Sequence, residues 1–159
     1  MALYDRALPQ VYGYLLSRSG DRAVAEDLTA ETFFAAVDAV RRDTPTAVSA
    51  PWLIGVARHK LVDHWRRRAR DEQGLRAVSA EAAVEDPWDV RLDALTARST
   101  LARLGPHHRA ALTLRYLDDL PVPEVAKILD RTVHATEALL VRARTAFRRA
   151  YTEDEVDHA

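Results

Sequence analysis

Apolar residues recur along most of this chain at intervals of three and four positions, which is the period of an α-helix. The first such segment is stopped by Gly20, and its apolar residues are Leu8, Val11, Tyr12 and Leu15. A second helix is predicted to begin at Asp21, with an approximate apolar face formed by Val24, Leu28, Phe33, Val37 and Val40. Turn-forming residues at 43–46 are expected to end it.

A third helix is predicted directly after this turn. Ser49 can cap it, and Pro51 fits its first turn because the N–H that proline lacks has no helical partner there. Its core-facing residues are expected to be Leu53, Val56, Ala57, Leu61 and Trp65. After Arg70 the periodicity weakens, which predicts a linker.

The helical period returns in the second half of the chain. Leu92, Leu95, Leu101 and Leu104 mark one helix, which ends at Gly105 and Pro106. The remaining helices are predicted at 107–117, 122–130 and 133–151.

The predicted fold class is therefore all-α, with two small helical domains joined by a linker. We place the first domain at residues 1–70, the linker at 71–88, the second domain at 89–152 and an acidic tail at 153–159. A length of 159 residues allows two small domains, and the apolar fraction of 48% is that of a globular protein. The chain has no cysteine and no apolar run near the roughly 20 residues that span a bilayer, so we expect a cytoplasmic protein without membrane insertion.

A net charge of −1 conceals a strong segregation of charges. Basic residues crowd the stretch 58–70 and recur at 142–149, whereas acids collect at 81–93 and at the carboxyl end. Arginines can neutralise phosphates, and an aromatic ring such as that of Trp65 can stack on an unpaired base, so the first basic stretch suits separating DNA strands. The alternative is that Trp65 is a core residue and the arginines form a solvated face.

Residues 123–129, a turn at 130–132 and a helix from Val133 have the form of a helix-turn-helix, whose second helix lies in the major groove. Ala126 supplies the small side chain that close packing of the two helices needs. Any helical hairpin in a bundle could produce the same pattern, so that reading stays open.

Catalytic chemistry has no support in this sequence. The histidines lack metal-ligand companions at productive spacing, and there is neither a glycine-rich phosphate loop nor a Ser-His-Asp arrangement. We therefore expect no enzyme activity, no catalytic residue, no metal, no cofactor and no small-molecule substrate.

Three stretches resemble the extracytoplasmic-function group of sigma factors, the promoter-recognition subunits of bacterial RNA polymerase. Residues 25–34, AEDLTAETFF, are similar to the family's AEDLxQETF helix, and residues 51–67, PWLIGVARHKLVDHWRR, to its WLxxIARNxxxDxxRR helix. Residues 104–116 resemble the segment LPxxxRxxxxLRY that opens the family's second domain. The order and spacing agree over nearly the whole chain.

This resemblance implies that the chain binds core RNA polymerase and promoter DNA and assists promoter melting. It implies a polymerase-binding surface at Asp27, Glu31 and Phe34. The residues that it assigns to the −10 element are Arg41, Arg58, His59, His64, Trp65, Arg66 and Arg67, beside a loop at 41–50 that would capture a flipped base. Those that it assigns to the −35 element are Arg131, Thr132, His134, Ala135, Glu137 and Arg142.

Several residues depart from the family's pattern. The turn has Asp130 where glycine is usual and Arg131 where an apolar residue is usual, and a run that is commonly basic and polar includes Glu137. A carboxylate repels phosphate, but it can accept a hydrogen bond from the amino group of cytosine, which bears on the preferred −35 sequence. The apolar run 139–141 is expected to be partly exposed and to be covered by a regulator or by the first domain.

Two other functions remain as alternatives. A stand-alone helix-turn-helix regulator would bind duplex DNA without polymerase, usually as a dimer, and a helical adaptor would bind only protein. Within the sigma-factor interpretation we expect control by a separate anti-sigma factor rather than by a sensor domain appended after Ala159.

Overall fold

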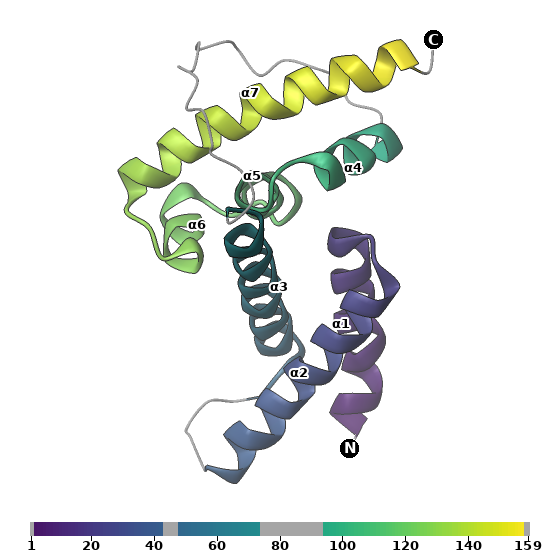
Figure 1. Cartoon of the computed structure of the whole chain (residues 1–159). Helices are drawn as coiled ribbons and strands as arrows, with labels where there is room; N and C mark the ends of the chain where they lie inside the picture. The colour runs from purple at the N-terminus through teal and green to yellow at the C-terminus, as the bar shows by residue number, and fades with distance from the viewer. Residues whose placement is uncertain (1, 43–47, 74–93, 158–159) are drawn as a thin grey trace. The chain divides into compact units, whose positions relative to one another are not determined.

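The computed structural model describes residues 2–42, 48–73 and 94–157 of the chain (Figure 1). Its elements are α1 (Ala2–Ser19), α2 (Arg22–Arg41), α3 (Ala50–Gln73), α4 (Ala94–Arg103), α5 (Pro106–Leu112), the π-helical turn η1 (Thr113–Leu117), α6 (Val122–Leu129) and α7 (Val133–Asp157). No strand occurs in these ranges, and the predicted all-α fold is confirmed. None of the helices in the same ranges is both long and apolar enough to cross a membrane.

The chain forms two compact units, Met1–His64 and Trp65–Ala159. The division falls inside α3, which continues through Gln73 and so includes the first residues of the predicted linker. The rest of that linker, and the turn predicted at 43–46, lie outside the described residues. The domain limits at residues 70, 88 and 152 therefore stay predictions.

In the first unit, α1 and α2 pack side by side (Figure 1). Gly20 separates them with a φ of 67°, in the left-handed region that glycine adopts without a steric penalty. The carboxylate of Asp21 then caps α2 by accepting hydrogen bonds from the backbone N–H groups of Ala23 at 2.9 Å and Val24 at 3.3 Å. Such a cap contributes about 1 kcal/mol, and both helix limits agree with the sequence prediction.

The buried face of α2 contains Leu28, as predicted, and otherwise consists of small or hydroxyl-bearing residues, which are Ala25, Thr29, Thr32 and Ala36. The hydroxyls of Thr29 and Thr32 donate to the carbonyl oxygens four residues earlier, at 2.6 and 2.7 Å, so their burial leaves no polar group unsatisfied. Val37 and Val40 are exposed, and the prediction that they face inward was wrong. Small side chains allow α1 and α2 to approach closely, and that approach decides which residues are buried.

The first part of α3 completes this unit. Its start is capped as predicted, because the Ser49 hydroxyl accepts a hydrogen bond from the Trp52 N–H at 3.3 Å. Leu53, Ala57 and Leu61 are fully buried along one face, as their spacing predicted.

In the second unit, α7 packs against α4, α5 and α6 (Figure 1). Leu139 and Leu140 are both buried, and Val141 is the partly accessible member of the run 139–141. A helix that is covered by three other elements buries residues on more than one side. The same helix continues to Asp157, so residues 153–157 of the predicted acidic tail are helical and the predicted end at Tyr151 was too early.

Candidate functional site

The connection between α6 and α7 has the geometry of a helix-turn-helix. Asp130 adopts φ 54° and ψ 49°, the left-handed conformation that aspartate tolerates better than most residues and that glycine adopts freely. The N–H of Arg131 donates to the carbonyl of Ala126 at 2.9 Å, which closes the end of α6. The Thr132 hydroxyl then accepts from the N–H of Ala135 at 3.0 Å and caps α7. Asp130, in place of the usual glycine, thus fits the backbone that the turn requires.

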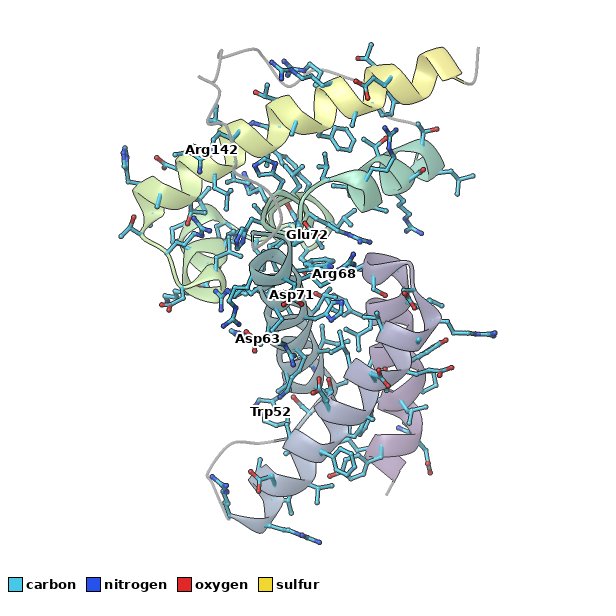
Figure 2. All side chains as sticks on the ribbon, viewed as in Figure 1. Trp52, Asp63, Arg68, Asp71, Glu72 and Arg142 are labelled. Atoms are coloured by element: carbon cyan, nitrogen blue, oxygen red, sulfur yellow. The ribbon has the colours of Figure 1, made fainter. Side chains whose placement is uncertain are left out.

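The residues expected to read the −35 element lie in this turn and in the first three turns of α7. Thr132, His134, Glu137 and Arg142 are exposed, and Figure 2 marks Arg142 on α7. The other two, Arg131 and Ala135, are partly buried. An exposed face at the start of the second helix is the surface that this motif presents to a major groove.

Two partly buried histidines of α5 lie near the arginines of this motif. Burial is the main cause that lowers the pKa of His107 in α5, and the guanidinium groups of Arg131 and Arg66 lower it further. Burial also lowers the pKa of His108, with smaller effects from Arg142 and His107. These two histidines were not among the residues predicted for the site. Their arginine neighbours come from other elements, so no local motif marks them.

The end of α3 belongs to the same compact unit. Trp65 is only 2% exposed, and the guanidinium of Arg109 in α5 lies 5.1 Å from its ring centroid. Burial, and secondarily Arg68, lowers the pKa of Arg109. The guanidinium of Arg66 donates to the carbonyl of Ile128 at the end of α6, at 2.9 Å. Trp65 is therefore a core residue of this unit, and Arg66 ties the end of α3 to α6.

The other candidates for the −10 element are distributed over both units. Arg41 lies exposed at the end of α2, and His59 is exposed on α3. Arg58 and His64 are partly buried, with the guanidinium of Arg58 5.9 Å from the ring centroid of Tyr14. In the second unit, Arg67 is exposed. Figure 2 shows the direction of α3 through its labelled residues Trp52, Asp63 and Arg68.

Asp27, Glu31 and Phe34 share one face of α2, because they are four and three positions apart. Asp27 is exposed, and Phe34 has 72% of its surface accessible. The exposed phenyl ring of Phe34 thus lies on the same face of α2 as the Asp27 carboxylate. The structure thus brings together the three residues expected to contact polymerase.

Among the described residues there is no group of three side chains of the types that hold a metal ion. The arrangement consists of a helical unit with an exposed acidic and apolar face, followed by a unit with a helix-turn-helix. Its chemistry is that of binding surfaces.

Two protein-family models match the chain: Sigma-70 region 2 at residues 3–71 and Sigma-70 region 4 at residues 95–147. Among curated proteins, the ECF RNA polymerase sigma factor SigM of Bacillus subtilis is 30% identical over 94% of this chain and 93% of its own length. The sigma factor BldN of Streptomyces coelicolor is 32% identical over 96% of this chain, which spans only 60% of that relative.

Among solved structures, the co-crystal structure of the sigma factor RpoE with the anti-sigma factor NepR from Bartonella quintana matches with a TM-score of 0.57. The alignment covers 94% of each chain at 21% identity, and it shows a shared fold. The region 2 and region 4 matches, in this order, define a sigma factor of the sigma-70 family. Within that family, the chain belongs to the extracytoplasmic-function sigma factors of RNA polymerase.

Proposed function

We propose that this chain directs core RNA polymerase to a particular set of promoters and helps to melt them. The first domain holds the −10 element, the second reads the −35 element, and the polymerase carries out the chemistry. The chain has no catalytic activity of its own. It acts in the cytoplasm, which contains the promoter DNA. The observation that carries the proposal is the exposed start of α7 in a capped helix-turn-helix. In the chain, this motif follows a region 2 domain.

The polymerase contact is the face of α2 that carries Asp27, Glu31 and Phe34. The exposed phenyl ring supplies apolar area, and the two carboxylates supply orientation toward basic groups of the partner. Val37 lies one turn beyond Phe34 and is also exposed, which extends the apolar surface.

The −10 contact uses the basic residues of α3 and of the end of α2. In this part of the proposal, Trp65 stacks on an unpaired base only after the contact with Arg109 has opened. Arg66 must in the same way leave the carbonyl of Ile128 before it can bind phosphate. Strand capture is therefore coupled to a rearrangement at the end of α3.

The −35 contact uses the turn and the exposed start of α7. Arg131 and Arg142 bind phosphates, and His134 reaches toward the base edges. A protein with a net charge of −1 should bind isolated duplex weakly. The polymerase holds both domains, so the −35 and −10 promoter elements are bound at the same time. This gives a selectivity that neither domain has alone.

We also propose regulation by an anti-sigma factor. Support comes from the co-crystal structure of RpoE with NepR, a sigma factor of the same fold bound to such a regulator. The regulator of this chain would compete with polymerase for the exposed face of α2 or with DNA for α7.

A run-off transcription assay tests the proposed function. Core polymerase is incubated with a fragment library of genomic DNA, with and without this protein, and the transcript starts are mapped. Under the proposal, new starts appear only when both proteins are present, and they share −35 and −10 sequences. A stand-alone regulator would instead protect duplex DNA without polymerase and would add no start to core enzyme.

A further inference from the structure

Glu137 is an acidic side chain in a surface that otherwise suits a polyanion. It lies on the exposed side of α7, one turn after His134, with Arg131 and Arg142 on the same helix-turn-helix. Within the part of the chain that the structure describes, no hydrogen bond or ion pair engages its carboxylate. The carboxylate is therefore accessible to a partner outside the protein.

The direction in which Glu137 points follows from helix geometry. Successive residues are about 100° apart around the axis, so Glu137 lies about 60° from His134. The buried residues of α7, which include Thr136, Leu140 and Ala143, are centred about 100° from Glu137 around the axis. Glu137 is thus exposed on the flank of α7 that it shares with His134, near the start of the helix that a helix-turn-helix inserts into the major groove.

An ionised carboxylate can only accept hydrogen bonds. Phosphates offer it no donor, and facing them costs Coulomb energy. The donors in the major groove are the N4 amino group of cytosine and the N6 amino group of adenine. On adenine the amino group lies beside the acceptor N7, which a carboxylate cannot satisfy but an amide can. Cytosine is therefore the base that suits glutamate.

We propose that Glu137 is a specificity-determining residue that selects a cytosine at one position of the −35 element. This inference rests on the proposed function, since it assigns a base to the surface that reads DNA there. One good pairing of this kind corresponds to a discrimination of roughly fivefold to a hundredfold or more against other bases.

The test compares Glu137→Gln and Glu137→Ala with the unchanged protein. A library with randomised −35 sequence is selected both by polymerase holoenzyme and by the isolated chain on duplex DNA. The unchanged protein should enrich cytosine at one position. Glu137→Gln should shift that position toward adenine, because an amide pairs with both N6 and N7, and Glu137→Ala should lose the preference there alone.

Glu124→Gln is the matched control. Its carboxylate is exposed on α6, where it lies 3.6 Å from the ammonium of Lys127, and its loss should leave the selected sequence unchanged. The inference is overturned if the unchanged protein enriches no cytosine, or if Glu137→Gln selects the same sequence as the unchanged protein. If the holoenzyme does not form but the isolated chain shows the predicted shift, the inference stands and the polymerase part of the proposed function fails.

Discussion

The guanidinium of Arg109 lies over the ring of Trp65, 5.1 Å from its centroid, and both side chains are buried. The contact joins the end of α3 to α5 within the second unit. A desolvated cation–π pair contributes about 2 kcal/mol. It stabilises this unit, and it also covers the ring that the resemblance assigns to a melted strand.

Arg109→Gln should therefore destabilise the second unit by about 1–2 kcal/mol. Urea unfolding followed by tryptophan fluorescence measures the change, and Arg98→Gln, at an exposed position of α4, is the control. If both variants unfold at the same urea concentration, the contact contributes nothing to stability.

The pH dependence of stability should reflect His107 and His108. The pKa of each is lowered, mainly by burial, so near pH 6 the folded chain binds fewer protons than the unfolded chain. Their contribution is fully present above the ordinary pKa of about 6.5 and is lost as the pH falls toward the lowered values.

Urea unfolding at about pH 8 and about pH 5.5 measures this effect. The His107→Gln, His108→Gln double variant should lose less stability between the two conditions than the unchanged protein, and the same substitution at the exposed His59 is the control. Equal losses for the unchanged and doubly substituted proteins would contradict the prediction.

Asp27→Arg should weaken the association with core polymerase by about tenfold or more, because it puts a positive charge into a surface proposed to face basic groups. Asp27 is exposed, so the circular dichroism spectrum should not change. The measurement is a pull-down with core enzyme. Its control is Glu26→Arg, at the preceding position and on a different face of α2. Undiminished capture of the Asp27 variant removes this face from the interface.

Arg142→Ala should reduce the magnitude of the slope of log affinity against log salt concentration by about one. This is the contribution of one phosphate contact, which the exposed guanidinium of Arg142 is proposed to make with the DNA backbone. The slope of log affinity against log salt concentration is measured on a −35 duplex. Arg98→Ala should leave the slope unchanged, and an unchanged slope for Arg142→Ala would exclude that contact.

Local signals in the sequence predicted where α1 ends and where α2 and α3 begin. Gly20, Asp21 and Ser49 act through the backbone of their immediate neighbours, so their roles follow from the sequence alone. The buried face of α2 could not be predicted in this way. Hydropathy favours Val37 and Val40, whereas packing against α1 selects the small and hydroxyl-bearing residues.

In the candidate site, too, local features could be predicted from the sequence, whereas contacts between distant residues could not. The −35 residues form a local motif, and the structure gives them one continuous location in the turn and the start of α7. The contact between Trp65 and Arg109 joins residues far apart in the chain, and so does the charge environment of His107. Periodicity carries no information about such partners.

The most direct test of the account is promoter melting by the complete complex. A promoter identified by mapping transcript starts is prepared with 2-aminopurine in its −10 element, and fluorescence is measured with core polymerase alone, with this protein alone and with both. The account predicts that fluorescence rises only when both are present. A rise with this protein alone, or no rise with both, would contradict it.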